Sequence, residues 1–196
     1  VIDNKVNNTH VLDFVIPKGP IGPAGPTLFR SAYLVTFNAD KSDTGVPVEP
    51  EARLPISRLE LDVSNLLELD EKEGLIKFNV AGYYRIFFTV SAYPSVNDVE
   101  FDPTKDIVSI GFKETNTDNV YLGVGQWVYN AEPVELSACG IIAVVDTAVT
   151  YELSNLGKYK IKRFGIKIPN LPLIIKSYFS NSLVTLVIDY LGKQGA

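Results

Sequence analysis

Hydrophobic and polar residues alternate along most of the chain with the two-residue period of β-strands. In Arg58–Val63 the leucines and the valine alternate with charged residues, which is typical of a strand with one face on a core and one in water. No long window has a helical period. Strands are predicted at Ala32–Asn38, Arg58–Val63, Leu75–Val80, Tyr83–Tyr93, Ile107–Lys113, Val120–Tyr129, Leu136–Val145, Val149–Leu153 and Leu183–Leu191. Short strands joined by Gly, Pro, Asn and Asp turns predict an all-β sandwich or barrel.

The pattern changes near the N-terminus. Val11–Ile16 alternates like a short strand, and then Gly19, Gly22 and Gly25 recur every third residue, each followed by Pro. This is the Gly-X-Y pattern of collagen, in which only Gly fits at the triple-helix axis. A phosphate loop is excluded because Pro removes the N–H donors that such a loop uses. A Pro/Gly linker is the alternative. The predicted organisation is a short β-module (1–18), a collagen-like stem (19–27) and a globular head (28–196).

Of two predicted strands, Ile141–Val145 is apolar on both faces and Leu183–Leu191 is nearly so. One face of an antiparallel sandwich normally meets water, so these strands need a second apolar neighbour. A collagen-like stem would bring three chains together, which favours another subunit, whereas a thick core within one chain is the alternative. The predicted trimer-interface residues are Ile142, Val144, Leu186, Ile188 and Tyr190.

Composition narrows the class of protein. The chain has 196 residues, 46% of them hydrophobic, enough for one domain that buries about 70% of its unfolded surface. No apolar run approaches the roughly 20 residues of a membrane helix. The net charge of −5 argues against general nucleic-acid binding. The absence of Met predicts an excised domain or a processed product.

Catalytic chemistry has little support. His10 is the only histidine and Cys139 the only cysteine, which argues against catalytic triads, disulfides and Cys-based zinc sites. We therefore predict no enzyme, no catalytic residue, no metal site and no cofactor, and expect Cys139 to be a small buried strand residue. The acidic loop Asp98–Asp106 carries oxygen ligands of the kind that Ca²⁺ prefers, but it lacks EF-hand spacing and is interpreted as solvated.

A basic segment alternates with apolar residues near the C-terminal part of the chain. Its cations are Lys158, Lys160, Lys162 and Arg163. They make one face of a predicted hairpin a candidate site for an anionic polysaccharide. The favoured alternative is a solvated edge hairpin whose lysines block pairing with other strands.

One spacing resembles the signature region of the C1q/TNF-like globular domain. It comprises Gly74, Ile76, Gly82, Tyr84, Ile86 and Phe88. Gly82, Tyr84 and Phe88 match by type, whereas Ile76 and Ile86 stand where the family usually has Phe. Weaker similarity continues to the end of the predicted head, so that the resemblance covers residues 31–191. It implies a ten-stranded jelly roll that assembles as a tight trimer, commonly at the C-terminal end of a collagen stalk.

The segment Leu12–Pro20 resembles the β-module that precedes collagen-like repeats in bacterial surface proteins and phage tail fibres. The whole arrangement is similar to the collagen-like glycoproteins of bacterial spore surfaces, the BclA-like exosporium filaments. The resemblance implies an extracellular homotrimeric head on a spore or cell surface, structural or adhesive, with a surface polysaccharide or a host or receptor protein as candidate partner. The alternatives are a phage tail-fibre receptor-binding head and, as a third class, a carbohydrate-active enzyme.

Overall fold

The computed structural model describes residues 2–6, 9–13, 30–37, 45–94, 107–127, 134–157, 160–161, 166–167, 173–175 and 182–193. Within these ranges the chain forms strands and turns only, and no helix there is long and apolar enough to cross a membrane. The strands are β1 (Ile2–Val6), β2 (Thr9–Asp13), β3 (Arg30–Phe37), β4 (Val46–Val48), β5 (Arg58–Asp62), β6 (Leu67–Asp70), β7 (Leu75–Phe78), β8 (Gly82–Pro94), β9 (Ile107–Glu114), β10 (Val120–Trp127), β11 (Val134–Val144), β12 (Thr150–Asn155), β13 (Lys160–Ile161), β14 (Ile166–Lys167), β15 (Leu173–Ile175) and β16 (Ser182–Gly192).

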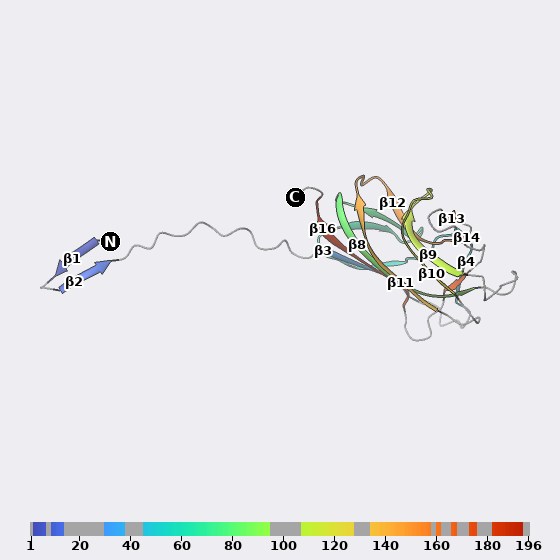
Figure 1. The fold of residues 1–196 in the computed structure, drawn as a ribbon, viewed down its shortest axis with the longest axis horizontal. Helices are drawn as coiled ribbons and strands as arrows, with labels where there is room; N and C mark the ends of the chain where they lie inside the picture. The colour runs from blue at the N-terminus through green and yellow to red at the C-terminus, as the bar shows by residue number, and fades with distance from the viewer. Residues whose placement is uncertain are drawn as a thin grey trace.

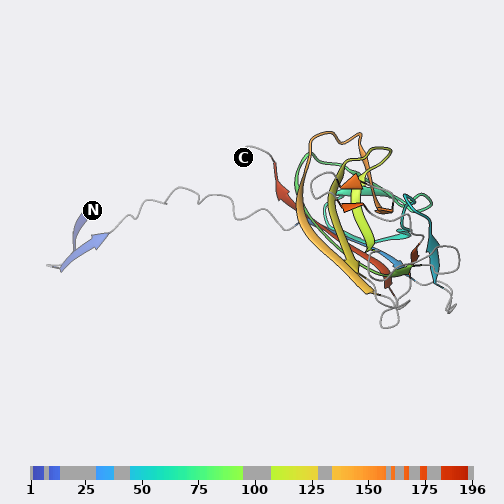
Figure 2. The same cartoon turned by 45° about the vertical axis from the view of Figure 1, so that its right-hand side comes forward.

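Two antiparallel sheets make up the head (Figures 1 and 2). The five-stranded sheet has the order β10-β9-β12-β7-β6. The seven-stranded sheet has the order β4-β15-β8-β16-β3-β5, with β11 paired to β8. The prediction of an all-β sandwich is confirmed. The strands β1, β4, β6 and β15 were not predicted. β4, β6 and β15 have only three or four residues, too few for a clear period, and β1 alternates too weakly to stand out from a polar segment.

β8 is the central strand of the seven-stranded sheet, and it pairs with β11, β15 and β16. Successive side chains of a strand point to opposite faces. Tyr84, Ile86 and Phe88 are therefore buried in the core together, whereas Arg85 and Phe87 between them are exposed. The spacing that resembles the C1q/TNF-like signature thus lies on the core side of this strand.

Two glycines of that spacing occupy positions that a side chain would disturb. Gly74 has φ +66° in the turn before β7, and Gly82 has φ +153° at the start of β8. A Cβ on Gly82 would lie 2.5 Å from the carbonyl oxygen of Gly192 and 2.6 Å from Cε2 of Tyr190. The close approach of β8 and the end of β16 therefore requires glycine here.

A series of aromatic contacts crosses the core at the end of the head where β3 begins. Tyr151 contacts Phe78, Phe78 contacts Tyr84 and Tyr84 contacts Tyr190, with ring centroids 5.1, 4.4 and 5.1 Å apart. The guanidinium of Arg30, the first residue of β3, lies 5.7 Å from the Tyr190 ring centroid. Burial, with a smaller contribution from Tyr190, raises the pKa of Tyr84 to about 12. This chain of rings joins the two sheets.

Candidate interaction face on the seven-stranded sheet

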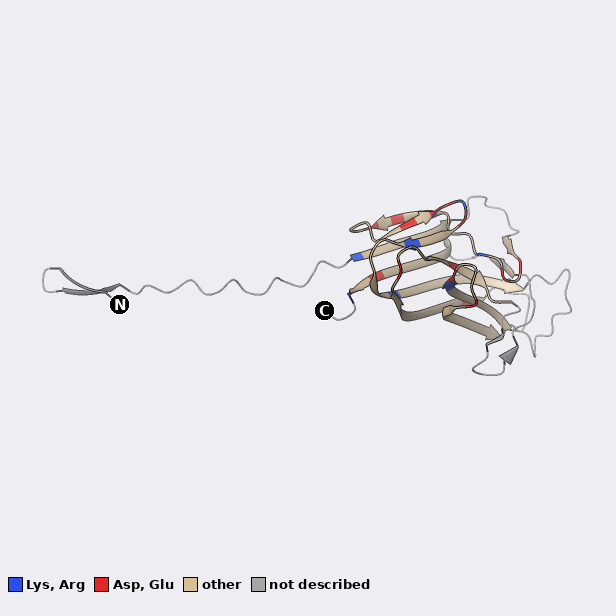
Figure 3. Cartoon of the chain, turned by 90° about the horizontal axis from the view of Figure 1, so that it is seen from above, with Lys and Arg blue, Asp and Glu red and all other residues tan. Residues whose placement is uncertain are grey.

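Exposed apolar side chains concentrate on one surface of the head. Eight large hydrophobic residues in the described part of the chain are exposed, and six of them lie on or directly beside strands of the seven-stranded sheet. The six are Leu61, Val63, Phe87, Ile141, Val145 and Leu191. Most strand positions are neither basic nor acidic (Figure 3). Apolar exposure of this kind on a sheet favours contact with another molecule.

The strand register joins part of this surface into a continuous row, which we call the apolar sheet face. Phe87 on β8 lies opposite Cys139 on β11 and opposite Val187 on β16. Val187 in turn lies opposite Tyr33 on β3, and Tyr33 opposite Leu61 on β5. Residues directly opposite each other share a face of the sheet. The apolar sheet face therefore crosses five strands. Phe87 (39% exposed) and Leu61 (52% exposed) are its exposed large apolar residues, and Tyr33 and Val187 between them are half-buried.

The neighbouring row carries an ion pair. Arg85 donates from Nε and Nη2 to Oδ2 of Asp189, at 2.8 and 2.5 Å, and Ser31 Oγ donates to Oδ1 of Asp189 at 2.6 Å. The Asp189 side chain is 10% exposed, whereas that of Arg85 is 51% exposed. The hydrogen bond and the charge of Asp189 raise the pKa of Arg85. The carboxylate is thus satisfied within the chain, whereas half of the Arg85 side chain remains exposed to solvent.

β11 lies at one edge of this sheet. Among the described strands it pairs only with β8, along eleven residues. Its sequence contains no Lys, Arg or Pro, the residues that commonly protect an edge strand from pairing with another chain. Ile141 is 66% exposed. Cys139 is also exposed, so the expectation that it is buried is wrong: it stands on the outer face of this edge strand.

The structure corrects the predicted interface residues. Ile142, Val144, Leu186 and Ile188 are at most 3% exposed and pack in the chain's own core, so they offer no surface to a partner chain. Tyr190 is half-buried against that core. Both faces of β11 are apolar from Ile141 to Val144, so this part of the sequence could not indicate which face meets the core. The neighbouring position Ile141 is the exposed one.

One signal in the sequence could have identified the outward residues. If Tyr84, Ile86 and Phe88 face the core, the alternation of β8 places Phe87 and Arg85 on the other side. An apolar aromatic residue at an outward position of a central strand is the feature that points to the apolar sheet face.

Several predicted sites lie outside the described residues. These include the stem glycines Gly19, Gly22 and Gly25, the acidic loop 98–106, and Lys158, Lys162 and Arg163 of the basic hairpin. Lys160 lies on β13, which pairs with β14, and the register places Lys160 opposite Lys167. Within the described ranges no three His, Cys, Asp or Glu side chains form a group that could hold a metal ion.

The five-stranded sheet carries a buried ionic network on the face that points away from the core. Glu152 on β12 lies opposite Lys113 on β9. Its carboxylate accepts from Arg53 Nε at 2.8 Å and Ser154 Oγ at 2.7 Å, and lies 3.3 Å from Lys113 Nζ. Burial opposes ionisation, but these hydrogen bonds and the two cations together lower the pKa of Glu152. The network is closed within the chain and fixes the segment that carries Arg53 against this sheet.

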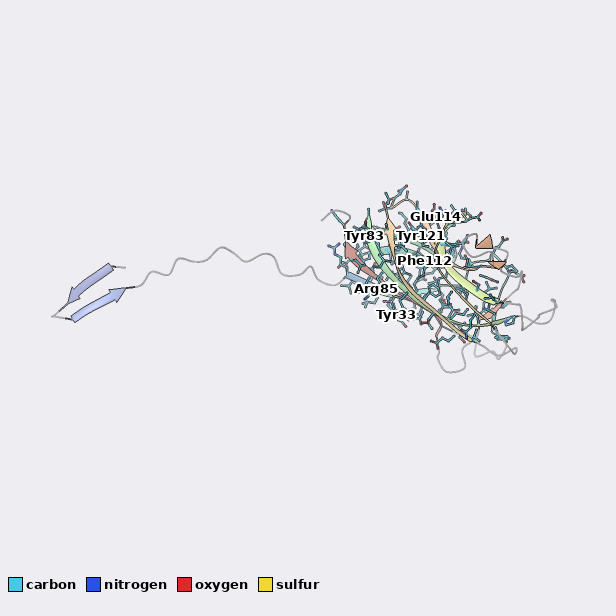
Figure 4. All side chains as sticks on the ribbon, in the orientation of Figure 1. Tyr33, Tyr83, Arg85, Phe112, Glu114 and Tyr121 are labelled. Atoms are coloured by element: carbon cyan, nitrogen blue, oxygen red, sulfur yellow. The ribbon has the colours of Figure 1, made fainter. Side chains whose placement is uncertain are left out.

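A smaller polar group lies at the end of the same sheet. Glu114 Oε2 accepts from Tyr121 Oη at 3.3 Å and from Asn119 Nδ2 at 3.1 Å, and the Tyr121 ring lies 5.8 Å from that of Tyr151. Figure 4 labels Glu114 and Tyr121 on this side of the molecule, and Tyr33 and Arg85 on the seven-stranded sheet. The contacts of Glu114 close the turn between β9 and β10.

Comparison with solved structures identifies the fold. An Eiger TNF from S. frugiperda is similar to this chain with a TM-score of 0.54 and 12% sequence identity, over 86% of this chain and 96% of that one. Murine APRIL is similar with a TM-score of 0.54 and 9% identity, over 83% of this chain and 99% of that one. The globular domain of a zebrafish complement 1qA protein has 8% identity and a TM-score of 0.48 over 84% of this chain and 99% of that one, so the comparison rests on the first two.

No protein-family model matches the chain, and no curated protein sequence matches it. The likeness is therefore one of fold: the head is an all-β jelly roll like those of the Eiger TNF and APRIL structures. The fold expected from the resemblance around Gly74–Phe88 is confirmed.

Proposed function

We propose that this chain is the subunit of a homotrimeric extracellular head with a structural or adhesive role and no enzymatic one. The proposal rests on one observation above all, the apolar sheet face that crosses five strands and is exposed in the single chain. Burying a fully exposed side chain of this size contributes about 1.5–3 kcal/mol. Phe87 is 39% exposed and Leu61 52% exposed, so covering what remains of each contributes about 0.6–1.6 kcal/mol. Several such residues per chain supply a strong driving force for association.

The contact that we propose joins two different surfaces. The β11 strand of one chain, with Ile141 exposed on its outer face, packs on the apolar sheet face of the next chain around Phe87 and Leu61. Such a head-to-tail contact generates a closed ring when the rotation between neighbours closes. Three chains are favoured because the Gly-X-Y triplets at 19–27 are typical of a three-chain stem and because the C1q/TNF-like resemblance implies a trimer.

The wider context follows from the same features. A head behind a collagen-like stem supports a fibre tip on a bacterial spore or cell surface, with a surface polysaccharide or a host or receptor protein as its partner. Three triplets are too few to hold a triple helix, so the head would have to keep the chains together. The alternative is that the head belongs to a phage tail fibre, where it would bind a receptor. Long collagen-like repeats upstream of this segment favour the spore filament, whereas a tail-attachment domain there favours the phage.

Light scattering of the purified chain tests the assembly. We expect a mass of three chains of 21.6 kDa each. Phe87→Asp would place an unpaired charge in the contact and shift the mass to that of one chain. Val120→Asp is the matched control, because Val120 is 37% exposed compared with 39% for Phe87 but lies on the other sheet; it should leave three chains. A monomeric parent chain, or equal masses for the two variants, would contradict the proposal.

A further inference from the structure

The N-terminal strands form a small sheet of their own. β1 and β2 pair antiparallel over five residue pairs, from Ile2 opposite Asp13 to Val6 opposite Thr9. Neither strand pairs with either sheet of the head (Figure 1). An isolated two-stranded hairpin is marginally stable at best in water, and it needs further strands or an apolar partner for independent stability. Among the described strands the hairpin has no such partner, so contact with another molecule would stabilise it.

The register divides the hairpin into two unequal faces. Positions directly opposite each other share a face, and positions along a strand alternate between faces. One face holds the positions of Ile2, Asn4, Val6, Thr9, Val11 and Asp13. The other holds the positions of Asp3, Lys5, His10 and Leu12. The first face has three β-branched apolar residues and its only charge is at the end of β2, whereas three of the four residues on the second are ionisable.

We propose that the β1–β2 hairpins of three chains associate through the Ile2–Val6–Val11 face and form a second assembly point at the far end of the stem. This inference rests on the proposed trimeric head. Sixteen residues, 14–29, separate β2 from β3, and a chain of that length spans at most about 55 Å. A trimeric head therefore confines its three hairpins to a small volume, where an effective concentration in the millimolar range allows a weak contact to form.

A second assembly point would also help to align the collagen-like segment that lies between the hairpin and the head. Only Gly19, Gly22 and Gly25 follow the Gly-X-Y period, and so short a stretch cannot align three chains by itself. Joining the chains before and after this stretch aligns it from both ends. Because the positions of Asp3, Lys5 and His10 lie on the opposite face of the hairpin, that face favours water over a further layer of hairpins, and the trimeric head sets the number at three.

Distances between spin labels test this contact in the full chain. Cys139→Ser removes the only cysteine, and Lys5→Cys adds a labelling site on the polar face. Because packed sheets lie about 10 Å apart, we expect a narrow distribution of label distances below about 30 Å. Val11→Asp should abolish it. Leu12→Asp is the matched control: the same charge on the adjacent residue of β2, on the other face, should leave the narrow distribution in place.

The mass of each labelled protein in light scattering shows whether the trimer forms, and so distinguishes failure of the hairpin contact from failure of the trimeric head. A trimeric parent chain with a broad distribution, with distances well above 30 Å, or with equal effects of Val11→Asp and Leu12→Asp would overturn the hairpin contact and leave the trimeric head. Narrow distances in the parent chain together with a monomeric Val11→Asp chain would mean that the hairpins hold the trimer, which overturns the head as the assembling unit. A monomeric parent chain would overturn both.

Discussion

The ionic network around Glu152 should make a large contribution to the stability of the head. The perturbation is Glu152→Gln, which keeps the shape of the side chain and removes its charge. The Lys113 side chain is 5% exposed and that of Glu152 6%, so both groups of this pair lie out of water. Breaking a buried pair by removing one partner costs about 3–5 kcal/mol.

The cost should fall near the lower end of that range. Lys113 Nζ also donates to the carbonyl of Thr117 at 3.1 Å, and that bond survives the substitution. The Arg53 side chain is 29% exposed and also lies 3.0 Å from Glu73, so water and Glu73 compensate part of its loss. We therefore expect Glu152→Gln to lower the free energy of unfolding by about 3 kcal/mol.

The pH dependence follows from the lowered pKa of Glu152 in the folded chain. Such a group stabilises the fold fully above its unfolded pKa, about 4.3, and the stabilisation is lost as the pH falls through the lower folded-state pKa. The difference between the parent chain and Glu152→Gln should therefore be constant from about pH 7 to 5 and shrink in more acidic solution.

Urea unfolding at a fixed protein concentration, followed by the fluorescence of Trp127, measures both effects. Glu68→Gln is the control, since the pair Glu68–Lys77 is 62% and 43% exposed and should contribute about 0–1 kcal/mol. The ionic network does not stabilise the head in this way if Glu152→Gln costs no more than Glu68→Gln, or if its cost at pH 7 persists unchanged at pH 3.

Two further predictions concern the strand β8 and the apolar sheet face. Gly82→Ala should lower the melting temperature, because its Cβ would meet the Gly192 carbonyl at 2.5 Å, and overpacking costs about 1–3 kcal/mol. Gly192→Ala, at φ +131° with nothing within 4 Å of the added Cβ, should cost only the backbone strain, and equal melting temperatures would contradict this. Cys139 is exposed in the single chain but covered in the proposed trimer, so it should react with a thiol reagent more slowly in the parent protein than in Phe87→Asp. Equal rates would argue against the contact.

Local sequence determined much of the fold. The two-residue period predicted the all-β class and most of the longer strands, because alternation is a property of neighbouring residues. The spacing from Gly74 to Phe88 predicted the C1q/TNF-like jelly roll, and it marks the core side of β8 together with two glycines at positive φ. The strands β4 and β15, at three residues each, have no comparable signal, since they exist only through pairing with distant parts of the chain.

Tertiary structure decided which apolar residues are available for binding. Along β11 the sequence is apolar at both Ile141 and Ile142, and only packing against the five-stranded sheet places Ile142 in the core and leaves Ile141 in water. Two ion pairs join residues that are far apart in the chain and lie opposite each other on adjacent strands: Arg85 with Asp189, and Lys113 with Glu152. Strand register between such distant residues is set by the packing of whole sheets. The two-residue period therefore predicts that a strand has two faces, but it does not predict which face packs in the core and which remains exposed.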